Sequence, residues 1–274
     1  MVVEKGSWNS ESLESTIRKN IHEGAQLFLD YDGTLVPIIL NPEESLPPEN
    51  VKKLLSRISL KYDLYVVSGR SVEDLEKFLG PELNFIAMHG ACARIDGKVM
   101  CLKDDYMNYV HHCREIEEMH IEKSFEGLRV YPKGGGILFH LGLVSKDRRE
   151  RVVSIVSGLA KQYGMELYIG KDIAEIKIPG SNKGDSIKMF RNNKPCLVAG
   201  DEMTDESAFS ACPECISIHV GNSKTAATYS VPGIFLKAVP SRFQAESFPL
   251  DSLLWERGFH HSQEITGPLH ESFP

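Results

Sequence analysis

Short apolar runs alternate with amphipathic segments along most of the chain, and this pattern predicts strands that alternate with helices. Outside residues 105–178, the predicted helices are Ser10–Glu23, Pro48–Ile58, Ser71–Leu79, Lys183–Asn192, Thr204–Ala211, one from about Ser223, and Pro240–Trp255. The predicted strands there are a run that ends at Asp30, Tyr62–Val67, Asn84–Met88, Cys196–Ala199, Ile216–Val220 and Ile234–Leu236. The pair Asp96-Gly97 predicts a hairpin over Ala93–Cys101.

The middle of the chain has a different pattern. Between residues 105 and 178 the predicted order is helix, two strands, helix, two strands, and each strand pair is joined by a turn that contains glycine. These elements are Asp105–Lys123, Leu128–Tyr131, Gly136–Leu143, Lys146–Tyr163, Glu166–Ile169 and Ile173–Ile178. Strands in this order favour an antiparallel sheet under two helices.

The two patterns together predict an α/β protein with a discontinuous core. Residues 1–104 and 179–274 would form a doubly wound, Rossmann-like parallel sheet with helices on both faces. Residues 105–178, here called the insert, would form a separate α+β domain of the order αββαββ. Ligands of doubly wound sheets bind beyond the carboxyl ends of the strands, so polar residues at those ends are the candidates for a site.

Two carboxylates stand at the end of the first buried strand. Asp30 and Asp32 are one residue apart, and Gly33 follows them. Like charges at the end of a buried strand are poorly solvated and repel each other. Mg²⁺ binds to one or two carboxylates together with phosphate oxygens, so it is the candidate for compensating this charge. An ordinary acidic turn is the alternative interpretation.

Composition and charge narrow the possible partners. The formal net charge of the 274 residues is −7, which argues against a nucleic-acid partner. The charge lies outside the insert, whose 11 basic and 11 acidic residues balance. No apolar run approaches the length of about 18 residues that spans a bilayer, so we expect no membrane association and a cytoplasmic location. The six cysteines lack a framework spacing and are expected to be reduced thiols, with Cys212-Pro213-Glu214-Cys215 in a loop between a helix and a strand.

Four further polar clusters follow other predicted strands. Ser68-Gly69-Arg70 follows the second strand, and His89-Gly90 follows the third. Ser68 could equally serve only as a helix cap, and both roles can hold together. Gly200-Asp201-Glu202 with Asp205 follows a later strand, where carboxylates four residues apart can converge on one metal ion. Pro179–Gly184 places Lys183 at the head of a helix, although lone lysines are usually solvated.

The stretch Asp30-Tyr31-Asp32-Gly33-Thr34-Leu35 resembles motif I of the haloacid dehalogenase (HAD) superfamily, and its continuation resembles the trehalose-6-phosphate phosphatase branch. The clusters Ser68-Gly69-Arg70, Pro179–Gly184 and Gly200–Asp205 resemble motifs II, III and IV, in the right order along the chain. The resemblance implies that Asp30 is the nucleophile and Asp32 the general acid/base. It implies roles for Ser68 and Lys183 at the phosphoryl group, and for Arg70, His89 and Gly90 at the substrate. The implied Mg²⁺ ligands are Asp30, Asp32 through its carbonyl, and Asp201, with Asp205 and Glu202 orienting ligand waters.

The insert resembles the C2-type cap, subtype B, which trehalose-6-phosphate, sucrose-phosphate and mannosyl-glycerate phosphatases share. The branch pattern E-x-K, H-Y-R and G-K-x-x-x-E implies that Lys133, His140, Lys171 and Glu175 bind the sugar. The match is partial, because Tyr131 stands where glutamate is usual and the arginine after His140 is missing. Glu122 offers another alignment for the first of these motifs.

The resemblance therefore implies a Mg²⁺-dependent phosphomonoesterase that acts on a small sugar phosphate, with trehalose 6-phosphate the first choice. One alternative is a related phosphatase that acts on a glucosyl- or mannosyl-glycerate phosphate or on sucrose phosphate. Another is a non-catalytic partner of a synthase, which the presence of both Asp30 and Asp32 disfavours. The protein is expected to be a monomer.

Overall fold

A computed structural model describes residues 10–39, 41–170 and 172–233 of the chain. The predicted strand Ile234–Leu236, the predicted helix Pro240–Trp255 and the candidate residue Lys171 lie outside the described residues. No helix among the described ranges is long and apolar enough to cross a bilayer.

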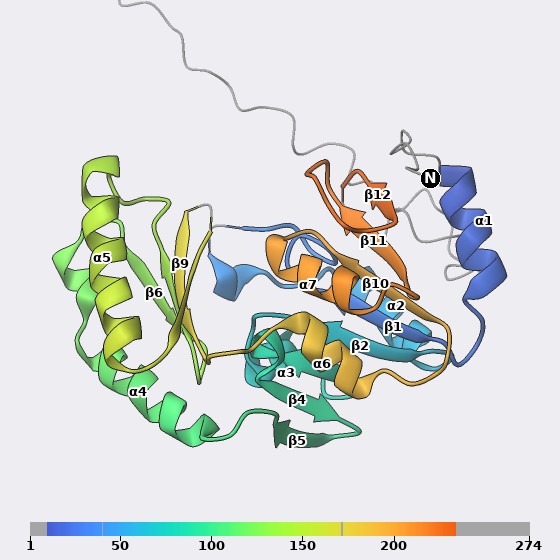
Figure 1. The fold of residues 1–274 in the computed structure, drawn as a ribbon, viewed down its shortest axis with the longest axis horizontal. Coiled ribbons are helices and arrows are strands. Elements are labelled where there is room, and N and C mark those ends of the chain that lie inside the picture. Colours follow the sequence, from blue (N-terminus) through green and yellow to red (C-terminus); the bar gives the residue numbers. More distant parts are fainter. Residues whose placement is uncertain (1–9, 40, 171, 234–274) are drawn as a thin grey trace, which may run out of the picture.

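The core is one sheet of eight strands in the order β12-β11-β10-β1-β2-β3-β4-β5 (Figure 1). The strands from β12 to β3 in this order are parallel to their neighbours, and the β4–β5 hairpin continues the sheet in antiparallel fashion. Their bounds are β1 Gln26–Asp30, β2 Asp63–Val67, β3 Asn84–Ala87, β4 Cys92–Ile95, β5 Lys98–Cys101, β10 Cys196–Gly200, β11 Ile216–Val220 and β12 Tyr229–Val231.

Helices cover both faces of this sheet, because its buried strands are apolar on both sides. Leu27 and Leu29 of β1 pack with the helices of one face, whereas Phe28 packs with those of the other. The first group is α1 Ser10–Asn20, α2 Glu49–Ser59 and α3 Val72–Leu79, and the second is α6 Lys183–Phe190 and α7 Met203–Ala211. The predicted doubly wound α/β core is confirmed.

The insert holds a second, antiparallel sheet of four strands in the order β6-β7-β9-β8. Its elements are α4 Tyr106–Glu118, β6 Arg129–Pro132, β7 Ile137–His140, α5 Lys146–Gln162, β8 Glu166–Ile169 and β9 Ile173–Lys177. Ile137, Phe139, Ala174 and Ile176 pack against the two helices. Because side chains alternate along a strand, the residues between these four belong to the opposite face of the sheet. In Figure 1 the opposite face of the sheet is turned toward the core.

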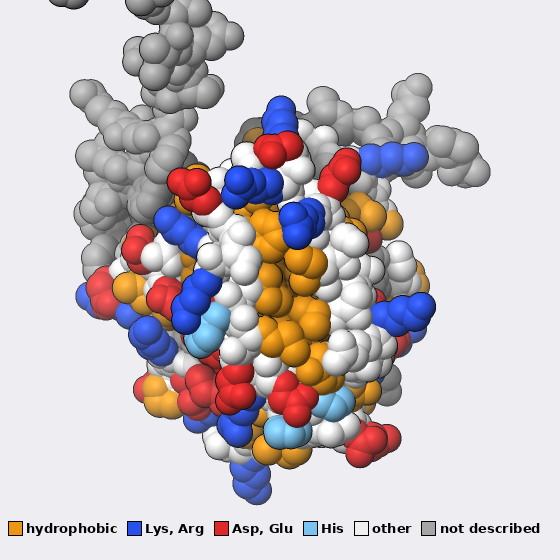
Figure 2. All heavy atoms as spheres, turned by 90° about the vertical axis from the view of Figure 1, so that its left-hand side faces the viewer, with side chains coloured by type: hydrophobic (Ala, Val, Ile, Leu, Met, Phe, Trp, Pro, Cys, Tyr) orange, Lys and Arg blue, Asp and Glu red, His pale blue; other side chains and the backbone are white. Residues whose placement is uncertain are grey.

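The outer side of the insert, viewed in Figure 2, carries a stripe of hydrophobic side chains with positive and negative groups interspersed around it. This mixture agrees with the equal numbers of acidic and basic residues in residues 105–178. The division of the chain at residues 104 and 178 stays a prediction, as do the cytoplasmic location and the monomeric state.

Several predicted boundaries differ from the structure. The predicted helix from about Ser223 is wrong: residues 221–228 form bends and irregular backbone, and β12 begins at Tyr229. The helix predicted over Asp105–Lys123 ends at Glu118, and after a residue in the left-handed conformation, His120, a short 3-10 helix follows at Ile121–Ser124. The strand predicted over Gly136–Leu143 covers only Ile137–His140.

The prediction of reduced thiols is wrong for two of the six cysteines, because Cys196 and Cys215 form a disulfide with a Cα–Cα distance of 4.8 Å. Leu197 pairs with Ile216 in the neighbouring parallel strands β10 and β11, so the residues that precede them also lie side by side. Spacing along the sequence does not reveal this pairing, whereas strand register does. Cys212 is a free, buried thiol, and the segment Cys212–Cys215 lies between α7 and β11 as predicted.

Candidate active site

The nucleophile candidate and the lysine candidate meet at the carboxyl end of β1. Asp30 is the last residue of β1, and Lys183 is the first residue of α6, whose N-cap is the side chain of Asn182. The Nζ atom of Lys183 lies 2.7 Å from Oδ1 of Asp30 and 2.7 Å from Oδ1 of Asp205. All three side chains are buried. Residues 153 positions apart in sequence are therefore in direct contact at this edge of the sheet.

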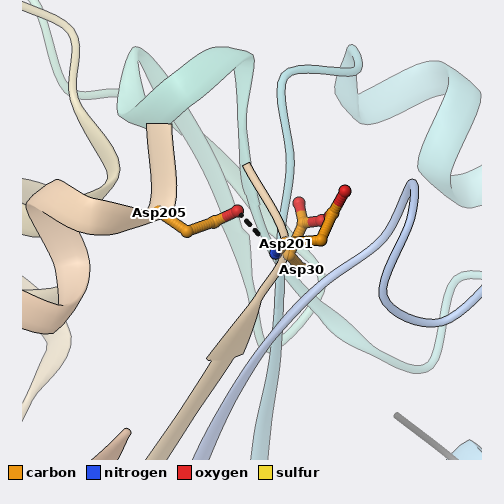
Figure 3. Close-up of side chains that lie close together, drawn as sticks. All are labelled: Asp30, Asp201 and Asp205. Carbon is orange, nitrogen blue, oxygen red and sulfur yellow. Dashed lines mark hydrogen bonds between the residues drawn. The ribbon is translucent and has the colours of Figure 1, made fainter. Parts of the chain in front are cut away.

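A third carboxylate completes a cluster at the same place. Asp30, Asp201 and Asp205 each offer an oxygen atom, and these atoms lie within 4.8 Å of one another (Figure 3). Asp205 reaches from α7 to the backbone of the preceding loop, where its Oδ2 accepts hydrogen bonds from the N–H groups of Asp201 and Glu202. The loop that carries Asp201 is thus fixed by a residue of the helix that follows it.

Gly33 allows the turn after Asp30 and Asp32 to approach Asp201 closely. Its φ angle is +85°, and a Cβ atom at this position would collide with the carboxylate of Asp201. The hydroxyl of Thr34 donates to Oδ1 of Asp201 at 3.2 Å. The turn formed by Gly33 and Thr34 after β1 therefore positions Asp201, the candidate metal ligand that follows β10.

The cluster carries more negative than positive charge. Burial raises the pKa of Asp30 well above its ordinary value, against the opposing effect of Lys183, and the carboxylates of Asp205 and Asp201 raise it further. Burial also raises the pKa of Asp201 to about 7. The two buried carboxylates that contact Lys183, together with the half-buried carboxylate of Asp201, form a hard oxygen donor set, and a divalent cation would offset their repulsion. The residues present fit a Mg²⁺ ion.

The general acid/base candidate, Asp32, makes a different set of contacts. Arg70 donates to both carboxylate oxygens of Asp32, from Nη2 to Oδ1 at 2.6 Å and from Nε to Oδ2 at 2.7 Å. The Arg70 guanidinium packs against the rings of both Tyr31 and Phe78, at 5.3 and 5.0 Å from their centroids, and donates to the carbonyl of Pro42. Arg70 thus holds Asp32 in this structure, and its predicted contact with substrate stays a prediction.

Ser68 and Gly90 occupy buried positions beside the cluster. Ser68 follows β2 and is 1% exposed, and its Oγ accepts the N–H of Arg70 at 3.2 Å. Gly90 packs against α6 so closely that a Cβ atom would collide with Ser186. Gly90 thus has a packing role here, and its predicted contact with substrate stays a prediction.

On the insert, Glu175 connects two of the other predicted residues. Its Oε1 accepts from Nζ of Lys133 at 2.9 Å, and its Oε2 lies 3.4 Å from Nε2 of His89 in the core. Burial opposes ionisation of Glu175, but Lys133 and His89 outweigh it and hold the pKa well below the ordinary range. Gly69 leaves room for the His89 ring, which lies 2.5 Å from the position that a Cβ atom would take. This trio joins the insert to the core.

His140 is also on the face of the insert sheet that carries Glu175, since Leu138 pairs with Glu175 and His140 follows two residues later. Its Nδ1 accepts the N–H of Gly142, and burial lowers its pKa. His140 is opposite Ile173, two positions along β9 from Glu175. Its sugar-binding role, like those of Lys133 and Glu175, stays a prediction.

Sequence motifs missed two residues of this face. Arg129 pairs directly with His140, where the expected arginine after His140 is missing, and Tyr168 pairs with Glu175. Burial raises the pKa of Tyr168, and the charges of Glu202 in the core and Glu175 in the insert raise it further. The two-residue alternation along β6 and β8 could have identified both as facing the site.

Comparison with solved structures shows which known folds this fold resembles. A phosphatase of the HAD enzyme superfamily from Bacteroides thetaiotaomicron matches with a TM-score of 0.51 over 82% of this chain and 94% of its own, at 16% identity. The crystal structure of a trehalose-6-phosphate phosphatase related protein matches with a TM-score of 0.75 at 38% identity, and covers 78% of this chain and 93% of its own. The HAD phosphatase fold predicted from the motifs is confirmed.

The sequence comparisons identify the family within this class. The profile of the trehalose-phosphatase family matches residues 28–233. A trehalose-6-phosphate phosphatase-related protein of Thermoplasma acidophilum is 40% identical over 207 residues, which is 75% of this chain and 90% of that protein. The chain belongs to the trehalose-phosphatase family, and the prediction of a phosphatase is confirmed.

Proposed function

We propose that the protein hydrolyses trehalose 6-phosphate to trehalose and inorganic phosphate through a phosphorylated Asp30. The observation that carries this proposal is the buried cluster in which Lys183 bridges Asp30 and Asp205 beside Asp201. The family match supports the substrate class.

Asp30, the backbone carbonyl of Asp32 and Asp201 would hold a Mg²⁺ ion, with Asp205 fixing the loop of Asp201 from behind. The ion supplies charge stabilisation for the phosphoryl oxygens when it is bound. Lys183 holds Oδ1 of Asp30 and adds a second positive charge beside the reacting group. The protein thus orients Asp30 before substrate arrives.

In the first step, a carboxylate oxygen of Asp30 attacks phosphorus, and the bond from phosphorus to the sugar oxygen breaks. Asp32 gives its proton to the departing sugar oxygen. In the second step, Asp32 takes a proton from water, which attacks the phosphorus of the aspartyl phosphate and frees Asp30. Arg70 holds Asp32 in place between these steps, through two parallel hydrogen bonds.

The face of the insert sheet turned toward the core supplies the sugar contacts in this proposal. Lys133, Glu175 and Tyr168 offer charged and hydroxyl groups that can hydrogen-bond sugar hydroxyls, and the last two pair across neighbouring strands. An insert that covers the site as a cap would keep bulk water away from the aspartyl phosphate.

A second candidate is a phosphatase of another glycosyl phosphate. It is favoured by the composition of the insert face, where Tyr131 replaces a glutamate and Arg129 on a neighbouring strand replaces the arginine after His140. Hydrogen-bonding sites discriminate strongly between sugars with different hydroxyl positions, so such changes can redirect specificity.

Phosphate release separates these candidates. The purified protein with Mg²⁺ would be assayed on trehalose 6-phosphate, sucrose 6-phosphate, glucosylglycerate phosphate and glucose 6-phosphate. The first proposal predicts the highest kcat/KM for trehalose 6-phosphate, and a higher value for any other sugar phosphate would contradict it. Asp30→Asn serves as the background control.

A further inference from the structure

Two free cysteines lie opposite each other in the β4–β5 hairpin. Cys92 pairs with Cys101 in the antiparallel register, and both are free thiols. Residues directly opposite in an antiparallel pair extend to the same face of the sheet. The Cys92 thiol interacts with the Cys101 side chain and with the hydroxyl of Tyr106, the first residue of α4.

The hydrogen-bonding pattern of the hairpin brings these thiols close. The N–H of Leu102 donates to the carbonyl of Ala91 at 2.8 Å, so residues 91 and 102 form a hydrogen-bonded pair. Pairs alternate along an antiparallel ladder, and the next pair, Cys92 with Cys101, is therefore of the non-hydrogen-bonded kind. In such pairs the Cα atoms lie about 4.5 Å apart, within the range that a disulfide spans.

We infer that Cys92 and Cys101 form an oxidisable dithiol site, which low-molecular-weight disulfides convert to an intramolecular disulfide. Cys101 is exposed and Cys92 is 3% exposed, so an oxidant reaches Cys101 first. Burial also raises the pKa of the Cys92 thiol to about 12, which favours Cys101 as the first nucleophile.

The exchange balances in two steps. The Cys101 thiolate attacks one sulfur of glutathione disulfide, forms a mixed disulfide and releases one glutathione thiolate. Cys92 then attacks the Cys101 sulfur, gives up its proton and releases the second glutathione. The protein dithiol is oxidised to a disulfide while one glutathione disulfide is reduced to two glutathione molecules.

The Cys92–Cys101 pair lies next to the segment that joins the core to the insert. Cys101 is the last residue of β5, directly before residues 102–105, which lead to α4. The side chain of Lys103 in this linker donates at 2.6 Å to the carbonyl of Gly180, which lies in the segment that leads from β9 of the insert back to α6 of the core. A bond between Cys92 and Cys101 would attach the start of the first linker to β4.

The test treats the folded full-length protein with excess glutathione disulfide, followed by intact mass and non-reducing peptide mapping. The wild-type protein is expected to lose two hydrogen masses and to yield a Cys92–Cys101 peptide pair, which a reductant reverses. Cys101→Ser, a change at an exposed position, should stay unmodified, and Cys92→Ala should retain one glutathionyl group on Cys101. The buried thiols Cys113 and Cys212 are internal controls that should remain free.

Two results would overturn the inference. The first is a wild-type protein that keeps a stable glutathionyl group on Cys101 or stays unmodified. The second is a crosslink that maps to Cys113 or Cys212. Neither readout depends on phosphatase activity, so a failure of the proposed function would leave this result unaffected.

Discussion

The guanidinium of Arg70 binds the carboxylate of Asp32 through two hydrogen bonds of 2.6 and 2.7 Å, at 7% exposure of the arginine. Arg70 follows β2, and two aromatic rings and the carbonyl of Pro42 hold its guanidinium in place. Arg70 in turn fixes the position of Asp32. Because Arg70 acts through Asp32, its replacement should affect the step that needs a proton more than the attack by Asp30.

Arg70→Met is expected to lower kcat for the sugar phosphate by about 100-fold, the size of a lost general-acid contribution. Its kcat for para-nitrophenyl phosphate should fall much less, because that leaving group departs without a proton. Steady-state kinetics on both substrates measures the split. Lys77→Met, at an exposed position of α3, is the matched control, and an equal loss on both substrates would contradict this role.

Removal of divalent cations should abolish turnover, and Mg²⁺ should restore it. An ion that the folded carboxylate cluster holds would not bind the unfolded chain, so we expect Mg²⁺ at 100 times its Kd to stabilise the protein by about 2.7 kcal/mol. Thermal unfolding with and without Mg²⁺ measures this effect. Asp201→Asn should lose the stabilisation, whereas Glu73→Gln, on the exposed side of α3, should keep it. Equal stabilisation of Asp201→Asn would place the ion elsewhere.

Gly33→Ala should lower the catalytic activity as well as the stability of the protein. Alanine at φ +85° is strained, and its Cβ would displace the carboxylate of Asp201. Gly24→Ala is a close control, because Gly24 has φ +83° and open space around it. Both variants are expected to lose about 1–2 kcal/mol of stability. Only Gly33→Ala should also lose more than about tenfold in kcat, and equal activity in the two variants would show that Asp201 tolerates displacement.

Glu175 should make stability depend on pH in the acid range. Its pKa is lowered in the folded protein, so its ionised form contributes stability above the unfolded value of about 4.3. This contribution is lost as the pH falls through the folded pKa. At neutral pH, Glu175→Gln is expected to cost roughly 3–5 kcal/mol, as for a broken buried ion pair.

The free energy of unfolding, measured by denaturant titration between about pH 7 and pH 3, tests this expectation. The difference between wild type and Glu175→Gln should shrink toward the acid end. Glu150→Gln on the exposed side of α5 should run parallel to wild type. A difference that stays constant with pH would show that Glu175 gains nothing from its partners Lys133 and His89.

Most of the core could be predicted from the sequence, because its buried strands and amphipathic helices have strong periodic patterns. Asp30, Lys183, Asp201 and Asp205 were identified by motif and by their place at strand ends, and the structure brings them together. Their catalytic roles stay predictions. The error at Ser223 arose in a segment with no clear periodicity, where irregular backbone leads to a strand at Tyr229.

Relationships across strands were harder to predict, because they depend on register. The Cys196–Cys215 disulfide, the Arg129–His140 pair and the Tyr168–Glu175 pair each join residues whose spacing in the sequence carries no signal. The pairing of Arg70 with Asp32 likewise follows from the adjacency of β1 and β2. Motifs identify reactive residue types, whereas the contacts that orient them come from the fold.

The central claim, that Asp30 becomes phosphorylated, can be measured directly in the Asp32→Asn variant. With para-nitrophenyl phosphate and Mg²⁺, the first step needs no proton donor, and hydrolysis of the aspartyl phosphate lacks its base. Rapid acid quenching and mass spectrometry should find one phosphoryl group on the peptide that contains Asp30. The Asp30→Asn/Asp32→Asn double variant should have none. Phosphate on another residue, or full turnover by Asp30→Asn, would contradict the account.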